Sequence, residues 1–209
     1  MKIINDFEQG SDEWIEFRKG KISGTILGDI YSKPNKDGIS KRKIGFYQII
    51  ADKLGDDYDG ENLMDRGLRL EDEANEIFEQ KTGLKTEKAG VCVSAFNPEI
   101  INSPDRLIKI DGKYSQAVEI KCLGTARHLQ AVIENEVPAE FESQKIQYFI
   151  CNDELQTLNF VFYDPRIQSI PYHCIEVKRE DIADKIELFK EYEIKTLEEI
   201  AILVERLAW

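Results

Sequence analysis

Residues 85–121 consist of short β-prone groups separated by turn residues, and this segment limits the possible folds more than any other. The separators are Asn97-Pro98, Ser103-Pro104 and Asp111-Gly112. Such pairs interrupt strands and favour chain reversals. The segment therefore predicts three consecutive strands joined by turns, which pair with one another as a meander.

Helical periodicity lies on both sides of this segment. Apolar residues three and four apart predict helices over about 40–54, 63–82, 139–151 and 181–209. Two further strands are expected at 157–163 and 172–177, on either side of Asp164-Pro165. A sheet with helices in this order buries both its faces, which predicts an α+β fold with a central mixed sheet flanked by helices. No repeat or linker divides the 209 residues, so we expect a single domain over 1–209.

The chain is strongly acidic, with 28 Lys and Arg against 40 Asp and Glu and a net charge of −12. This balance argues against a protein that holds nucleic acid by a broadly basic exterior. No apolar run approaches the roughly 18–20 residues that span a bilayer, and the polar N-terminus does not resemble a signal peptide. We therefore expect a cytoplasmic protein with no membrane association.

The four cysteines are widely spaced, and no CxxC pair is present. Zinc and iron–sulfur sites built on cysteine need clustered ligands, so both are disfavoured and four reduced thiols are expected. His128 follows Arg127 in a polar stretch, and we expect it at the surface rather than acting as a general base.

The segment with the most chemical information runs from the tripeptide Ser-Pro-Asp at 103–105 to Glu119, Ile120 and Lys121. A hairpin of this length returns Glu119 beside Asp105 on a neighbouring strand. Side chains alternate along a strand, so Glu119 and Lys121 share one face and Ile120 points to the other.

This grouping suits a metal site that acts on phosphate. Carboxylates such as Asp105 and Glu119 are preferred ligands of Mg²⁺, and the Ile120 backbone carbonyl is a further possible ligand. Lys121 would position or activate a water molecule, or stabilise charge on the phosphate. The same residues also fit a plain alternative, in which Asp105 caps a turn and Glu119 forms a solvated pair with Lys121.

A further carboxylate, Glu71, lies on the predicted helix 63–82, next to Leu70 at the edge of the apolar stripe. A side chain in that position is able to point into a cleft. Its neighbours Asp72, Glu73 and Glu76 are assigned to the solvated face, and Glu71 itself also fits that acidic face.

Several motifs in order resemble the YqaJ-like viral recombinase family, the phage lambda-exonuclease relatives within the PD-(D/E)xK nucleases. The resemblance covers about residues 8–178, and its first block, QGSDEWIEFRKGKISGT, is similar to the family pattern QGSxEWxxxRxGxITAS. The remaining blocks are GxxxExxA at 67–74, SPD at 103–105, EIKC at 119–122, Gln144, and YDPR at 163–166. Two departures stand out: ISGT replaces ITAS, and Gln144 and Gln147 are three residues apart where the family often has QxQ.

The resemblance implies a restriction-endonuclease-like αβββαβ core and a metal-dependent deoxyribonuclease. It implies two Mg²⁺ ions, for which Mn²⁺ would substitute, and 5′→3′ exonuclease digestion of double-stranded DNA ends. The products would be 5′-mononucleotides and a 3′ single-stranded overhang for phage recombination. It also implies a homo-trimer that works beside a single-strand annealing protein in the cytoplasm of a bacterial host.

Residue roles follow from the matched motifs. The resemblance assigns Asp105, Glu119 and the Ile120 backbone carbonyl to the metal, and Lys121 matches the catalytic lysine. Glu71 matches a helical carboxylate that assists the metal or a water molecule. Gln144 matches a glutamine near the active site, although Gln147 lies at a spacing that also allows it to face the site.

The N-terminal block carries the expected contacts to the DNA end. Arg18 and Thr25 match positions that hold the 5′-terminal phosphate, and Ser23 is an alternative to Thr25. The resemblance thus divides the chain into a DNA-end-binding part at 1–30, a catalytic core at 60–178 and a C-terminal helix at 180–209. Because the net charge is negative, DNA contact must be local, and the basic clusters at 18–21 and 41–43 are expected to line its path.

Two other functions remain open at this level. One is an endonuclease or structure-selective nuclease of the same superfamily. The other is a catalytically silent DNA-binding or assembly module that retains the fold.

Overall fold

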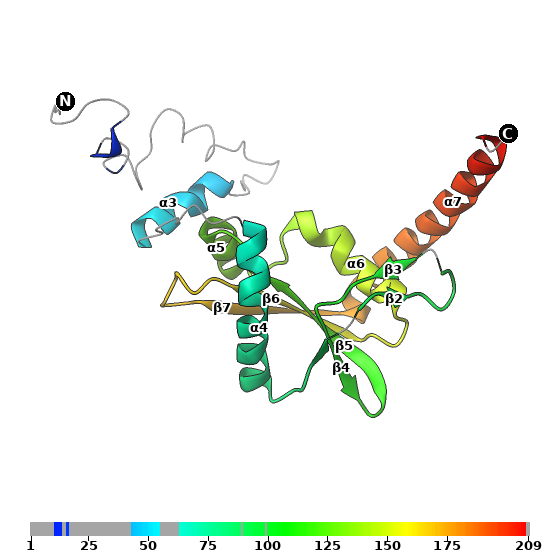
Figure 1. Cartoon of the computed structure of the whole chain (residues 1–209), viewed down its shortest axis with the longest axis horizontal. Coiled ribbons are helices and arrows are strands. Elements are labelled where there is room, and N and C mark those ends of the chain that lie inside the picture. The colour runs from blue at the N-terminus through cyan, green and yellow to red at the C-terminus, as the bar shows by residue number, and fades with distance from the viewer. Residues whose placement is uncertain are drawn as a thin grey trace.

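The computed structural model describes residues 11–13, 16, 43–54, 63–88, 90–98 and 100–207, shown in Figure 1. The expected 5′-phosphate contacts Arg18, Ser23 and Thr25 lie outside these ranges, as do the basic residues at 18–21, 41 and 42. Within the described ranges, no helix has both the length and the hydrophobicity to cross a membrane.

The described elements alternate between helices and strands along the chain. Short one-turn helices lie at Ala139–Phe141 and Arg179–Ile182. In chain order, the other elements are α3 (Ile44–Leu54), α4 (Leu63–Thr82), β1 (Glu87–Lys88), β2 (Cys92–Val93), β3 (Ile101–Asn102), β4 (Arg106–Ile110), β5 (Lys113–Lys121), α5 (Thr125–Glu134), α6 (Glu142–Cys151), β6 (Thr157–Tyr163), β7 (Tyr172–Lys178) and α7 (Ala183–Leu207).

The central sheet has the strand order β1-β4-β5-β6-β7. Strands β5 and β6 are parallel, and the other neighbouring pairs are antiparallel. Parallel neighbours need a crossover connection, which here contains α5 and α6. The sheet is therefore mixed, as expected from the sequence, and a separate small sheet is formed by β2 and β3.

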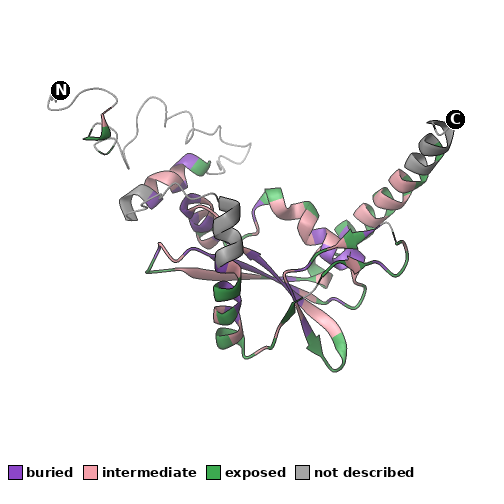
Figure 2. Ribbon diagram, in the orientation of Figure 1, coloured by how far each residue is buried: buried purple, intermediate pink, exposed green. Residues whose placement is uncertain are grey.

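Helices cover the two faces of this sheet and form two buried clusters, seen as purple segments in Figure 2. On one face, Phe78 of α4 packs with Val118 of β5. On the other face, Phe149 of α6 packs with Ala117 of β5 and Phe160 of β6. Successive β5 residues thus point alternately toward α4 and α6, and this alternation places the side chains of the site.

The helix at 63–82 and the strand at 157–163 have the predicted bounds, while the segment 85–121 differs from expectation. Its described residues form five strands rather than three. Two of the five, β4 and β5, are long, whereas β1, β2 and β3 pair over only two residues each. The β4–β5 hairpin is the long pair that the sequence anticipated, with the Asp111-Gly112 turn in left-handed backbone at φ values of 50° and 84°.

Helix α5 was not expected, and the predicted surface position of His128 is wrong. The His128 side chain is fully buried, and its Nε2 lies 2.8 Å from the backbone oxygen of Ile170. The polar residues Arg127 and Gln130 masked the helical pattern, although Leu129 and Ala131 are buried. The four cysteines are free, as predicted.

The turn after β6 contains an ion pair within the YDPR motif. Arg166 Nε lies 3.0 Å from Oδ1 of Asp164, whose side chain is fully buried. Thr125 at the start of α5 donates a hydrogen bond of 2.6 Å to Asp164 Oδ2. This motif therefore fixes α5 against the end of β6.

Replacing Phe160 with alanine is expected to lower the free energy of unfolding by about 3–5 kcal/mol. The Phe160 ring is fully buried, and its centroid lies 6.1 Å from that of Phe162. Urea unfolding followed by circular dichroism measures the change. Phe96→Ala is the matched control, because Phe96 is 37% exposed and its loss should cost about 1 kcal/mol or less. Equal losses in the two variants would contradict this description of the core.

Candidate functional site

Asp105 lies directly before β4 and bonds to the part of β5 that continues beyond its pairing with β4. The pairing of β4 with β5 begins at Arg106 and Val118, and the Asp105 carboxylate continues it by accepting a 2.7 Å hydrogen bond from the Ile120 N–H. The N–H and C=O of one strand residue point to the same side of the strand. The Ile120 carbonyl is therefore directed to the side of β5 on which Asp105 lies.

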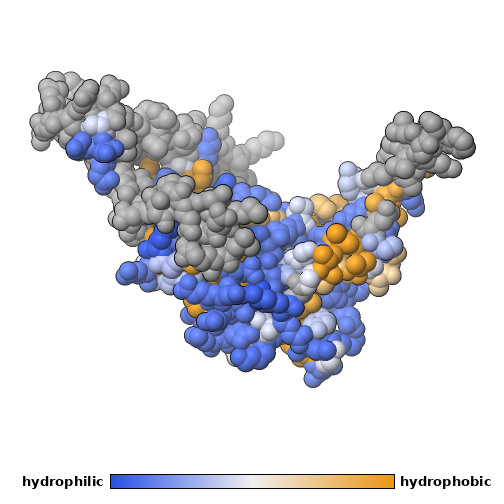
Figure 3. Space-filling model, in the orientation of Figure 1, coloured by the Kyte–Doolittle hydropathy of each residue, from blue (hydrophilic) through white to orange (hydrophobic). Residues whose placement is uncertain are grey.

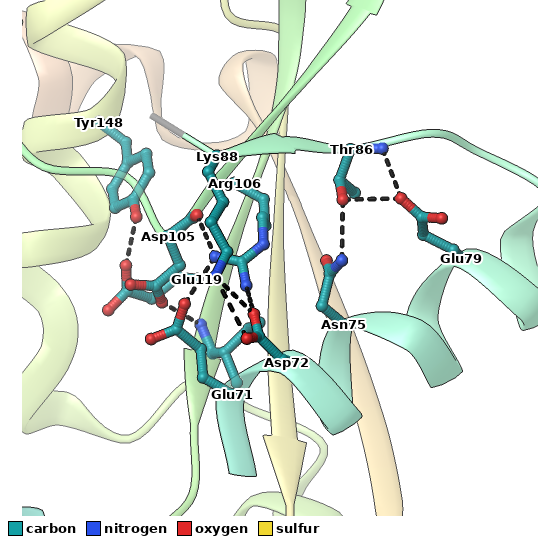
Figure 4. Close-up of polar contacts among 11 residues, drawn as sticks. Glu71, Asp72, Asn75, Glu79, Thr86, Lys88, Asp105, Arg106, Glu119 and Tyr148 are labelled. Carbon is teal, nitrogen blue, oxygen red and sulfur yellow. Dashed lines mark hydrogen bonds and ion pairs between the residues drawn. The ribbon is translucent and has the colours of Figure 1, made fainter. Parts of the chain in front are cut away.

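Glu119 is the most enclosed carboxylate of the site, with only 2% of the residue exposed. Its Oε1 accepts hydrogen bonds of 2.5 Å from Lys121 Nζ and 2.5 Å from Gln144 Nε2. Its Oε2 accepts a hydrogen bond from the hydroxyl of Tyr148, as Figure 4 shows. Burial of a carboxylate is costly without such partners, so these three donors hold Glu119 in one position.

Lys121 follows Glu119 by two residues and shares its face of the sheet. Its ammonium group lies 4.8 Å from the centroid of the Phe141 ring, and 17% of the side chain is exposed. The ammonium is thus fixed between a carboxylate and an aromatic face while it still reaches solvent. A group held in this way is able to contact a bound water or phosphate.

On the α4 side, Arg106 links Glu71 to the Asp105 backbone. Its Nη1 donates hydrogen bonds of 2.6 Å to Glu71 Oε1 and 2.6 Å to the Asp105 carbonyl oxygen. Its Nη2 lies 2.5 Å from Asp72 Oδ1, and Lys88 Nζ contacts the same oxygen at 2.8 Å. Figure 4 shows this group of side chains between α4 and the sheet.

The Asp105 carboxyl lies in an unfavourable place for a negative charge. Burial, and then the neighbouring charge of Glu119, raise the pKa of Asp105 to about 7, and the Ile120 N–H offsets only part of this effect. The ionised form of such a group is stabilised by a nearby cation. The half-buried Asp105 carboxylate and the buried Glu119 carboxylate, together with the Ile120 carbonyl, fit a hard divalent cation such as Mg²⁺.

The structure brings most of the predicted site residues together. Glu119, Ile120 and Lys121 lie with Asp105 at the start of β4, and Gln144 reaches them from α6. Glu71 is adjacent, but through Arg106, and no group of three His, Cys, Asp or Glu side chains placed to hold a metal is found among the described residues.

Of the two glutamines, Gln144 is the one that contacts the site. Gln147 points elsewhere and donates a 3.3 Å hydrogen bond to the Ile101 carbonyl oxygen. The structure thus places Gln144, and not Gln147, beside Glu119.

Two residues of the site, Arg106 and Tyr148, were not singled out in the sequence. Tyr148 lies four residues after Gln144, which places both on one face of α6. Arg106 directly follows Asp105, so its side chain leaves β4 on the opposite face, toward α4. Asp72, which was assigned to the solvated face, is exposed but also pairs with Arg106.

The fold matches that of known exonucleases. The crystal structure of an alkaline exonuclease from Laribacter hongkongensis superposes with a TM-score of 0.60 and 23% identity, covering 95% of this chain and 98% of that chain. LHK-Exo in complex with dAMP gives a TM-score of 0.59 at 23% identity, with the same coverage of 95% and 98%. No curated protein sequence matches the chain significantly. The model of the YqaJ-like viral recombinase domain matches residues 13–153, and the chain therefore belongs to that family.

Proposed function

We propose that the chain is a Mg²⁺-dependent exonuclease that digests double-stranded DNA from its 5′ ends. It would release 5′-mononucleotides and leave 3′ single-stranded overhangs for phage-type recombination. The proposal rests above all on the meeting of Asp105 and Glu119, both held by hydrogen bonds, beside Lys121. Membership of a viral recombinase family supports DNA as the substrate.

The metal would be held by the Asp105 and Glu119 carboxylates and the Ile120 carbonyl. Mg²⁺ held there would make a water molecule more acidic and would offset charge on the phosphate, and Mn²⁺ would substitute for it. The donor set is compatible with this choice, because all three ligands are oxygens.

The remaining residues orient the reaction. As an ammonium group, Lys121 has three hydrogen-bond donors and no acceptor, so it would orient the attacking water and contact a phosphate oxygen. Glu119 fixes Lys121, and Gln144 fixes Glu119. Water adds to phosphorus while the bond to the 3′ oxygen breaks, leaving a 5′-phosphate on the remaining strand and a 3′-hydroxyl on the released nucleotide. Glu71 would assist at the metal or its water.

The end of the DNA would be held by the N-terminal part, at 1–30. Arg18 offers a guanidinium fork and Thr25 or Ser23 a hydroxyl, and both groups suit a terminal phosphate. We propose the core at 60–178 as the catalytic part and 180–209 as an appended helix, within one domain.

Self-association into a homo-trimer is part of the proposal, as is cooperation with a single-strand annealing protein. Figure 3 shows hydrophobic surface gathered where β2 and β3 lie near α7. Val91, Val93 and Ile101 are 61%, 56% and 49% exposed there. Exposed apolar side chains grouped in this way are typical of protein contacts.

Exonuclease and endonuclease activities are distinguished by the form of the duplex. We expect Mg²⁺-dependent release of nucleotides from linear duplex and none from the same sequence as a covalently closed circle. Faster digestion of 5′-phosphate than 5′-hydroxyl ends would support the proposed phosphate contact. Cleavage of the closed circle would favour the endonuclease alternative, and no cleavage of either form would favour the silent DNA-binding module.

Gln144→Ala is expected to lower kcat by about tenfold to a hundredfold, because it removes one of the donors that hold Glu119. Gln147→Ala is the matched control on the same helix, and its kcat should remain within about twofold, since Gln147 points away from Glu119. Steady-state digestion of a labelled linear duplex measures both. A larger loss in the Gln147 variant would reverse the assignment.

A further inference from the structure

Arg106 is a buried cation beside the expected metal site. Only 3% of the residue is exposed, and its Nη1 lies 2.6 Å from Glu71 Oε1 and 2.6 Å from the Asp105 carbonyl oxygen. Its other terminal nitrogen pairs with Asp72 at 2.5 Å. The guanidinium thus joins α4 to the first residue of the metal site.

A cation in this position is difficult to displace. The guanidinium remains charged at all physiological pH values, and a buried charge that loses its partners is strongly destabilising. Glu71, whose side chain is 26% exposed, is therefore more favourably paired with Arg106 than released to another cation.

Arg106 already holds Glu71, the additional carboxylate that a second metal ion in this centre would need. Two-metal sites hold their ions about 3.5–4 Å apart, and the ions share carboxylates. An ion shared between Asp105 and Glu71 would meet the guanidinium that already bonds to Glu71 and to the Asp105 backbone. Repulsion between the two cations in a partly buried site opposes its binding.

The net charge of the side chains around the site also opposes the binding of a second ion. When every group is ionised, four carboxylates face three cations, which leaves a single net negative charge before any metal binds. One divalent ion reverses that balance, and a second would add a large uncompensated positive charge. The connected residues are Glu71, Asp72, Asp105, Glu119, Lys88, Arg106 and Lys121.

We propose that this centre binds one divalent cation, at Asp105 and Glu119, and that Arg106 takes the place of a second ion. This inference rests on the proposed function, and it departs from the two Mg²⁺ ions that the family resemblance implies. Arg106 is a positioning residue here: it holds Glu71 away from the metal and supplies fixed positive charge. Glu71 then acts on water or phosphate rather than as a direct ligand.

The number of bound ions tests this proposal directly. Titration of the full chain with Mn²⁺, followed by electron paramagnetic resonance of the free ion, should give one site-bound ion per chain. The Asp105→Asn variant should lose that ion, which identifies it as the one at the site. Two ions that are both lost in Asp105→Asn would overturn the single-ion centre.

Variants of Arg106 and of Lys88 give an independent test. Arg106→Gln should raise the count to two ions per chain, because Glu71 is freed and a positive charge is removed. Lys88→Gln, which alters only the outer partner of Asp72, should keep the count at one. A folded Arg106→Gln protein that still binds one ion would overturn the role of Arg106.

Glu71→Gln keeps the test valid if Arg106→Gln does not fold. Because Glu71 is not a ligand in this proposal, Glu71→Gln should still bind one Mn²⁺ ion per chain, with an affinity lowered by no more than about a hundredfold, the usual cost of losing a partner outside the ligand set. Loss of the ion as complete as in Asp105→Asn would overturn the proposal. If the wild-type chain bound no Mn²⁺ and released no nucleotides, the proposed function itself would fail; two ions with intact nuclease activity would refute only the single-ion centre.

Discussion

Lys121→Ala is expected to lower kcat for digestion of linear duplex by about a thousandfold or more. The variant removes the ammonium group that lies 2.5 Å from Glu119 Oε1 and the donors that it offers to water and phosphate. The fold should be largely retained, because the Lys121 side chain reaches solvent with 17% of its surface exposed. Association with DNA should be largely retained, because the proposed contacts to the DNA end lie in the N-terminal part at 1–30. Single-turnover digestion at saturating enzyme separates this loss of chemistry from weaker binding.

Lys113→Ala is the matched control for this variant. Lys113 begins the same strand, is exposed and pairs with Glu154 at the protein surface. Its removal should leave kcat within about twofold. Undiminished nucleotide release by Lys121→Ala would contradict the catalytic assignment.

Asp105→Asn is expected to abolish digestion and to remove metal binding at the site. Asparagine keeps an oxygen that accepts the Ile120 N–H bond, so the junction of β4 and β5 is preserved while the charge is lost. Without metal, the variant should be at least as stable as the wild type, because burial and the Glu119 charge disfavour ionised Asp105. Thermal unfolding with and without Mg²⁺ measures this, since only the wild type should gain stability from the metal.

The control for Asp105→Asn is Asp111→Asn, in the exposed turn between β4 and β5. Asp111 has a φ of 50°, a conformation that asparagine also tolerates. Activity and metal-dependent stabilisation should both match the wild type. Retained digestion by Asp105→Asn would show that the metal site lies elsewhere.

The central part of the site was predictable because it depends on local rules. Alternation along β5 separates Ile120 from its neighbours Glu119 and Lys121, and the hairpin length returns this strand to Asp105. These features need no knowledge of distant packing, and the structure reproduces the β4–β5 hairpin. The full three-strand meander is not reproduced, since β2 and β3 form a separate small sheet.

The residues that the sequence did not reveal depend on tertiary contacts. Arg106 looks like an ordinary strand residue until α4 packs across the sheet and brings Glu71 to it. Tyr148 has the apolar character of a core residue, and only the meeting of α6 with β5 gives its hydroxyl a carboxylate partner. Helix α5 was missed because its polar residues hide the helical pattern. One of them, His128, is nevertheless fully buried and contacts the distant backbone oxygen of Ile170.

The acidic composition is compatible with the proposed function. Some of the carboxylates belong to the expected metal site, where a bound cation would offset their charge. Others are exposed, such as Glu73 and Glu76 of α4. Phosphate responds to the local field rather than to the sum of charges. A net charge of −12 therefore limits where DNA can contact the chain, without excluding DNA as a substrate.

Digestion of end-labelled linear duplex with and without Mg²⁺ tests the central claim most directly. With Mg²⁺, a 5′ label should appear early as a mononucleotide, while a 3′ label should stay on long single strands. Without Mg²⁺, both labels should remain in full-length duplex. Release of the 3′ label first, or equal release of the 5′ label without a divalent cation, would contradict the proposed metal-dependent 5′→3′ exonuclease.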